Sequence, residues 1–183
     1  MARYSQKKIR KLIQQSDNAS TADKKGDKLE ELAKYLFGKI RGVTFYGKNI
    51  LDGNRAQEID VVFWNLQNVS DLCFLDAILI VECKNLCTPV SSSEVGWFVR
   101  KLQDRGAACG LLIILGGITG SQDGTSNAHS EVLSALTRDG IKIIILTRHE
   151  ILSLRLTYDL IKLIREKLLN LTLRKTVVID QQQ

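Results

Sequence analysis

Two charged side chains stand at the end of an otherwise apolar run, where they could carry chemistry. Ile78-Leu79-Ile80-Val81 is typical of a strand buried on both faces, and Glu82-Cys83-Lys84-Asn85 follows it directly. Side chains alternate across a strand, so Glu82 and Lys84 share one face. Opposite charges side by side at the end of a buried strand favour a functional site. The alternative is a salt-bridged strand end that emerges into solvent.

A carboxylate on the preceding strand would add to this pair. Asp60 lies in the predicted strand Glu58–Trp64, one polar turn earlier, and neighbouring strands lie about 4.8 Å apart. Asp76 is excluded, because the strand rise would put it roughly 20 Å from Glu82. Asp52 lies in a turn and is a weaker candidate. The alternative role for Asp60 is to accept turn hydrogen bonds at the end of its strand.

A fourth charged residue comes from a predicted helix that begins near Asp27. At about 100° per residue, Glu30 lies on the border of the apolar stripe of this helix, and Glu31 lies nearly opposite it. We therefore expect Glu30 to point along the core edge and Glu31 to face solvent. The alternative for Glu30 is a capping box with Asp27. The stripe itself has helical spacing and comprises Leu29, Leu32, Ala33, Leu36, Phe37 and Ile40.

Together these side chains suit the hydrolysis of a phosphodiester. Two or three carboxylates with water ligands suit Mg²⁺, a hard cation that prefers oxygen. Such a metal lowers the pKa of bound water and stabilises charge that develops on a phosphate. Lys84 points to the same side, where it can hold or deprotonate the attacking water and neutralise the pentacovalent phosphorus species.

This arrangement resembles the PD-(D/E)xK restriction-endonuclease-like superfamily and, within it, the Mrr-like restriction endonucleases. The resemblance covers about residues 26–155. Two departures are visible: Ile59 stands where the family often has proline, and Glu82-x-Lys84 replaces the Gln-x-Lys usual in Mrr-like enzymes. The matching segments are Gly26-x-x-Leu29-Glu30, Glu58-Ile59-Asp60, Val81-Glu82-Cys83-Lys84, Ser93-x-Val95-x-x-Phe98, the stretch from Leu111 to Thr119, and Ala128.

The resemblance implies a central mixed sheet flanked by helices and Mg²⁺-dependent phosphodiester hydrolysis, with Mn²⁺ as a possible substitute. It also assigns roles to four residues. Asp60 and Glu82 would be the metal ligands, Lys84 the water-activating lysine, and Glu30 an auxiliary acid.

The order of predicted elements gives the same fold class by an independent route. Three successive strands joined by turns predict an antiparallel start, and the crossover helices that follow demand parallel neighbours. We expect an α/β domain with a mixed sheet. The elements after the three strands are a helix opened by Ser91-x-x-Glu94, a strand at Gly110–Leu115, a helix at Ser126–Arg138, a strand at Ile141–Leu146, and a long last helix opened by Thr147-x-x-Glu150.

Composition fits one basic domain with short appendages. The chain has 183 residues and a formal net charge of +6, which favours a polyanionic partner. We divide it into a basic N-terminal segment (1–25), the nuclease domain (26–170) and a C-terminal tail (171–183). The N-terminal segment is either an arm that touches phosphate or a solvated, partly disordered terminus, and the second reading is favoured. The expected phosphate contacts are Lys48, Arg55, Arg100 and Lys101.

No signal peptide and no membrane span are recognisable, so we expect a cytoplasmic protein. The cysteines Cys73, Cys83, Cys87 and Cys109 form no zinc-site pattern and are expected to be reduced structural thiols. His129 and His149 have no acid–nucleophile context and are expected to be structural or exposed.

The leading hypothesis is an endonuclease that cuts DNA in restriction, defence or DNA processing. One alternative is a Holliday-junction resolvase or repair-type nuclease of the same fold. Another is a nucleic-acid-binding subunit that does not cut. Cutting two antiparallel strands with one site per chain is easiest for a two-fold dimer, so a homodimer is expected, and a partner chain could supply sequence specificity.

Overall fold

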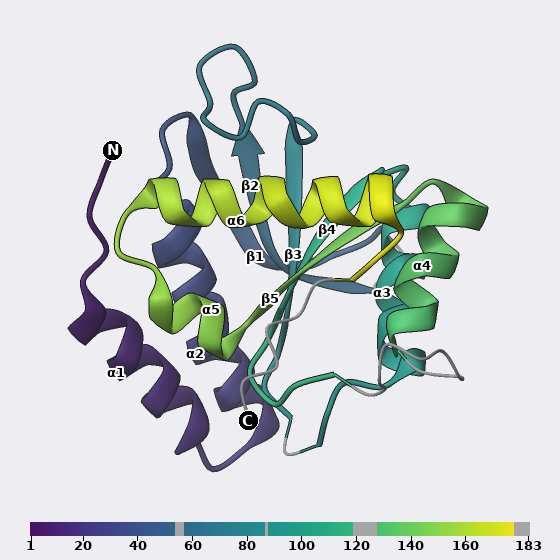
Figure 1. Ribbon diagram of the computed structural model, residues 1–183. Helices are drawn as coiled ribbons and strands as arrows, with labels where there is room; N and C mark the ends of the chain where they lie inside the picture. The colour runs from purple at the N-terminus through teal and green to yellow at the C-terminus, as the bar shows by residue number, and fades with distance from the viewer. Residues whose placement is uncertain (54–56, 87, 119–127, 178–183) are drawn as a thin grey trace.

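A five-stranded sheet forms the centre of the computed structural model, which describes residues 1–53, 57–86, 88–118 and 128–177. The strands lie side by side in the order of the chain (Figure 1). β1 pairs antiparallel with β2, and β2 with β3; β3, β4 and β5 are parallel. This confirms the predicted α/β class and the mixed sheet. The strands are β1 (Val43–Leu51), β2 (Glu58–Asn65), β3 (Ile78–Lys84), β4 (Cys109–Ile114) and β5 (Lys142–Thr147).

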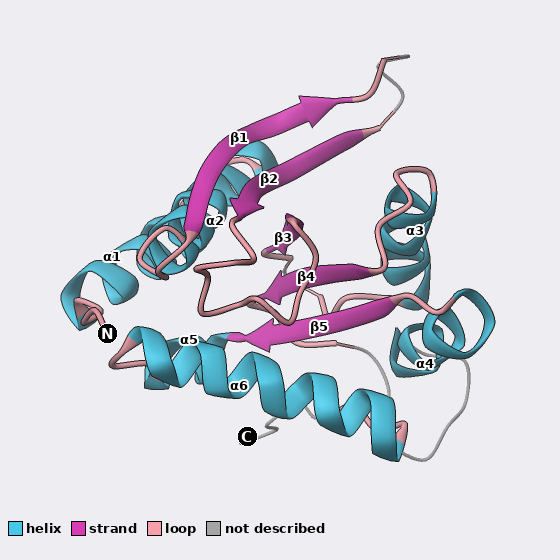
Figure 2. Ribbon diagram, turned by 90° about the horizontal axis from the view of Figure 1, so that it is seen from above, coloured by secondary structure: helices cyan, strands magenta, loops and turns pink. Residues whose placement is uncertain are grey.

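Helices cover both faces of the sheet and create two apolar cores. One core packs the first two and the last two helices against one face of the sheet, including Val61 and Val81. The other core packs α3 and α4 against the opposite face, including Val62 and Ile80. Figures 1 and 2 place α1 and α2 together at one end of the molecule and α3 and α4 at the other. The helices are α1 (Gln6–Asp17), α2 (Ala22–Phe37), α3 (Ser92–Gln103), α4 (Ala128–Asp139), α5 (Arg148–Ser153) and α6 (Thr157–Leu169).

The N-terminal segment is an integral part of the fold, so the expectation of a partly disordered terminus was wrong. Helix α1 packs on α2 and buries Ile9 and Ile13 in the first core. Helix α2 begins at Ala22, where the Thr21 side chain accepts a hydrogen bond from the Lys24 amide. The boundary placed after residue 25 therefore falls inside a helix. The alternative of a capping box between Asp27 and Glu30 is wrong, because Asp27 lies inside α2.

The last helix also differs from the prediction. Thr147 and Glu150 do form a capping box, but helix α5 ends at Ser153 because Leu154 takes an extended conformation. Helix α6 restarts at Thr157. After α6 the chain continues as a turn of π-helix at Asn170–Arg174, and Leu171 packs into the second core. Within the described parts of the chain, no helix combines the length and the apolar content needed to cross a membrane.

Candidate active site

Glu82 points into the protein rather than out of it. Along β3, Ile80 and Glu82 lie on the face of the sheet that α3 covers, and Val81 and Cys83 lie on the other face. The Glu82 residue is only 1% exposed. An isolated carboxylate at such a position would be strongly unfavourable, so its charge must be compensated nearby.

Two lysines provide that compensation. Lys101 of α3 places its Nζ 2.9 Å from Oε1 and 2.8 Å from Oε2 of Glu82. Lys84 places its Nζ 2.9 Å from Oε1 of the same carboxylate. The alternative reading of Glu82 and Lys84 as an exposed strand-end pair is thus wrong for Glu82, while Lys84 keeps 27% of its side chain exposed.

Asp60 stands opposite Glu82 at the end of the β2–β3 ladder. The last registered pair is Val61 with Val81, so the next residues of the two strands face each other. Asp60 Oδ2 accepts a 2.7 Å hydrogen bond from the backbone N–H of Cys83 and so ties the strand ends together. Burial and the charge of Glu82 raise the pKa of Asp60 to about 7, although the Cys83 amide and the two lysines oppose the shift.

Lys84 is held as a cation. Burial by itself lowers the pKa of its ammonium group, but the charge and hydrogen bond of Glu82, with the charges of Asp60 and Glu94, outweigh burial and raise it. In this arrangement Lys84 is therefore a hydrogen-bond donor and a positive charge. It is not a resting base.

Lys101 was predicted to contact phosphate, and that prediction is wrong. Its side chain is only 7% exposed, and both of its hydrogen bonds go to Glu82. Sequence reasoning missed it as a member of the site. The sequence did carry a sign that Lys101 is buried. Lys101 follows Phe98 by three residues, so it lies beside the apolar stripe of α3 that faces the sheet.

Glu30 belongs to a different charge cluster. Helix α2 covers the sheet face opposite to Glu82, and Glu30 is 8% exposed there. Lys48 of β1 lies 3.3 Å from its Oε2 and also pairs with Asp27. Among the described residues, Oε2 of Glu30 receives no hydrogen bond. Burial, partly opposed by Lys48, raises the pKa of Glu30.

The two clusters are separated by Cys83. Burial strongly raises the pKa of its thiol, and the charges of Asp60, Glu30 and Glu82 add to the shift. The structure thus brings Asp60, Glu82 and Lys84 together, whereas Glu30 lies behind the strand. Glu31 is partly exposed, on the outer side of α2.

The other predicted phosphate contacts have different surroundings. Lys48 is paired with Asp27 and Glu30. Arg100 is exposed on α3, and Arg55 lies outside the described residues. His149 is exposed, while His129 is buried in α4, where desolvation lowers its pKa.

Hydrogen bonds to the end of α1 hold the end of β3 in place. Asn85, directly after Lys84, donates a 2.7 Å hydrogen bond to Ser16 Oγ at the end of α1. The neighbouring Asp17 is bound by both terminal nitrogens of Arg148, at 2.8 and 2.7 Å. Helix α1 is therefore fastened to the strand end that carries the candidate site.

The carboxylates of the candidate site are a small donor set for a divalent cation. No group of three or more His, Cys, Asp or Glu side chains that could hold a metal occurs among the described residues. Asp60 and Glu82 supply two carboxylates, which is the number that Mg²⁺ commonly takes from a protein when waters and substrate oxygens complete its shell. Lys101 and Lys84 already pair with the oxygens of Glu82, so a Mg²⁺ at this site would have to share or displace those contacts.

Comparisons of the chain with models of protein families, with curated proteins and with solved structures find no match.

Proposed function

We propose that this protein is a Mg²⁺-dependent endonuclease that hydrolyses phosphodiester bonds in DNA, with a core of the restriction-endonuclease-like kind. The observation that carries the proposal is the close pair of Asp60 and Glu82 with Lys84 beside it. Burial and the charge of Glu82 raise the pKa of Asp60 to about 7, so Asp60 near neutral pH either binds a proton or remains charged with the help of a nearby cation. Raised pKa values of this kind concentrate at functional sites.

Each side chain has a role that follows from its surroundings. Lys84 remains protonated, so it would orient the attacking water or stabilise the negative charge that develops on the phosphate oxygens. Asp60 titrates near neutral pH and can accept a proton there. Lys101 neutralises Glu82 and fixes the direction of its carboxylate.

Asp60 and Glu82 are the residues that would hold Mg²⁺. When bound, the metal would supply a water of lowered pKa and positive charge next to the scissile phosphate. Glu30 lies on the other face of the sheet from Glu82. As an auxiliary acid it would therefore act across β3, without direct contact with the substrate.

One observation favours a second candidate, a nucleic-acid-binding protein that does not cut. Both oxygens of Glu82 are already paired with lysines, so the buried charge of Glu82 is compensated without a metal ion. On that reading Lys84 and Lys101 balance a buried charge, and no catalysis follows.

A cleavage assay separates the two candidates. Supercoiled, linear, branched and single-stranded DNA are incubated with the protein and Mg²⁺, with EDTA in the matched control. The nuclease proposal predicts cleavage that EDTA abolishes, and the preferred form of DNA would distinguish a general endonuclease from a junction resolvase. Binding without cleavage of any of these DNAs, with Mg²⁺ or Mn²⁺, would favour the second candidate.

A further inference from the structure

The positive charge of the protein is confined to its first elements. Residues 1–48 contain twelve Lys and Arg against five Asp and Glu, whereas the remaining fourteen basic and fifteen acidic residues nearly cancel. These first residues form α1, α2 and most of β1. The candidate active site contributes nothing to this excess, because Asp60 and Glu82 balance Lys84 and Lys101.

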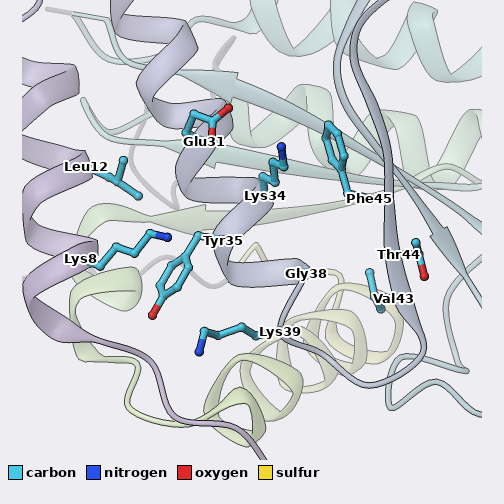
Figure 3. Close-up of a pocket in the computed structure, with 10 residues that line it drawn as sticks. All are labelled: Lys8, Leu12, Glu31, Lys34, Tyr35, Gly38, Lys39, Val43, Thr44 and Phe45. Carbon is cyan, nitrogen blue, oxygen red and sulfur yellow. The ribbon is translucent and has the colours of Figure 1, made fainter.

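Two hollows lie along the outer side of the α1–α2 pair. One, of about 470 Å³, is bounded by α1, α2 and the start of β1 (Figure 3). The other, of about 740 Å³, lies toward the turn that joins the two helices. Together the hollows are lined by six lysines, which we call the lysine face: Lys8, Lys11, Lys24, Lys28, Lys34 and Lys39.

The ammonium groups of the lysine face are available to a partner. Among the described residues, none of the six lysines forms an ion pair, in contrast to Lys48, Lys84 and Lys101. Three of them lie over aromatic rings instead, with Lys8 Nζ 4.4 Å and Lys39 Nζ 5.4 Å from the centre of Tyr35 and Lys34 Nζ 4.2 Å from that of Phe45. Lys39 also donates a 3.1 Å hydrogen bond to the backbone carbonyl of Arg3, which leaves its charge unneutralised. Figure 3 shows Lys8, Lys39 and Tyr35 gathered at one end of the hollow.

Aromatic support positions these cations without neutralising them. A ring face attracts an ammonium group but carries no net charge, so the charge stays available to an incoming anion. The acidic residues on the two hollows are Glu31 and Asp27, and Asp27 is already paired with Lys48.

The lysine face leads toward the candidate active site. Its hollow near the helix turn includes Asp27, which Lys48 joins to Glu30. The end of α1 is bonded to Asn85, the residue after Lys84. A rigid partner lying along α1 and α2 would therefore extend to the strand end that carries the site.

We propose that the lysine face binds the phosphate backbone of duplex DNA, as a docking surface separate from the site that cuts. The choice of DNA rests on the proposed function; the charge and the geometry call for an extended polyanion. Helix α2 has 16 residues and so spans about 24 Å, and duplex DNA carries one charge per about 1.7 Å of its axis. A small ligand would not need six separated cations, and an acidic peptide would first have to be ordered.

The test is DNA binding in EDTA, where no cleavage occurs. A 20-base-pair duplex of mixed sequence is titrated at several salt concentrations with wild type and with the variant K8Q/K11Q/K28Q/K34Q. Four lost phosphate contacts should lower the steepness of log Kobs against log salt by about 3 to 4, with roughly a hundredfold loss of affinity. The matched control R138Q/K162Q/R174Q/K175Q removes the same charge from exposed positions elsewhere, and it should bind within about threefold of wild type.

Further variants make the outcome decisive. The variant K8R/K11R/K28R/K34R should restore binding, and unchanged melting temperatures confirm that all the proteins are folded. DNA binding by the lysine face without cleavage would contradict the nuclease proposal and leave this inference standing. Four results would each overturn the proposal that the lysine face binds DNA. They are equal losses of affinity in both glutamine variants, no loss in the lysine-face variant, no DNA binding by wild type, and displacement of DNA by equimolar polyglutamate.

Discussion

Glu82 shows what the burial of one carboxylate requires from its neighbours. Lys101 satisfies both oxygens and is itself buried, while Lys84 reaches one oxygen from the solvent side. Attraction between charges in such a place is offset by the loss of hydration, so the pair contributes little net stability as a whole. Removing one partner is different, because the remaining charge stays buried and unpaired.

Replacing Lys101 by Met should therefore be costly. We expect Lys101→Met to lower the free energy of unfolding by about 3 kcal/mol, since Lys84 still offers partial compensation. The double variant Glu82→Gln/Lys101→Met should recover a large part of that loss. Urea unfolding measures both. The control is Arg100→Met, at the exposed neighbouring position, which should stay within about 0.5 kcal/mol of wild type. Equal stability of Lys101→Met and wild type would mean that the buried ion pair does not form.

Asp60 should make stability depend on pH. Its pKa in the folded protein is about 7, above the ordinary value of 3.8, so the folded state binds the proton more tightly than the unfolded state. The resulting stability is complete below about pH 4 and is lost as the pH rises to about 7. Asp60→Asn keeps an acceptor for the Cys83 amide but cannot ionise. Relative to wild type it should gain roughly 2–4 kcal/mol between pH 4 and pH 7.5, measured by urea unfolding. A constant difference over that range would contradict the raised pKa.

At the scale of elements, β3, β4 and β5 were predictable because these strands are nearly continuous apolar runs. The apolar run before Glu82 predicts a buried strand, and the apolar stripe of α2 predicts a helix that packs on the sheet. The shared face of Glu82 and Lys84 followed from simple alternation, and Asp60 was placed by the nearness of the neighbouring strand. The partner of Glu82 could not be read in the same way, because Lys101 is distant in sequence and only the packing of α3 on β3 brings it near.

Two elements were misjudged for physical reasons. The basic side chains of α1 concealed that Ile9 and Ile13 are spaced for burial, since one helical turn of apolar residues is a weak signal amid charge. The break between α5 and α6 is marked by neither Pro nor Gly. It depends on an extended Leu154 packed into the first core, which local sequence does not encode.

Helix α1 should be required for stability rather than serve as a detachable arm. Ile9 is fully buried against the first core. We expect Ile9→Ala to lower the free energy of unfolding by about 2–5 kcal/mol, and the exposed Lys7→Ala to change it by less than about 0.5 kcal/mol. Denaturant unfolding of both variants measures this. A protein lacking residues 1–17 that unfolds at the same denaturant concentration as the full chain would contradict the account.

At the scale of the whole molecule, the candidate site and the excess of positive charge lie in different places. The candidate site is nearly neutral, and the positive excess lies on residues 1–48, which form α1, α2 and most of β1. One site per chain can cut one strand at a time, so double-strand cleavage calls for two copies related by a two-fold axis. A partner chain that supplies sequence specificity is the other arrangement compatible with a single domain.

Assembly on DNA should be visible by light scattering. We expect two protein chains per duplex at saturation in EDTA, because two antiparallel strands present two equivalent scissile bonds. The measurement compares the mass of the free protein with that of the complex on a 20-base-pair duplex. One chain per duplex, together with nicking of only one strand in Mg²⁺, would contradict the dimer.

The central claim is that Asp60, Glu82 and Lys84 form a catalytic site, and its most direct test is Mg²⁺-dependent DNA cleavage by single variants at saturating DNA, with melting temperatures recorded in parallel. We predict that Asp60→Asn and Glu82→Gln nearly abolish cleavage. Lys84→Ala should slow it by about a hundredfold or more while DNA still binds, Glu30→Ala should have a smaller effect, and Glu31→Ala almost none. If folded Asp60→Asn and Lys84→Ala cut DNA as fast as wild type, the site described here is not the site of catalysis.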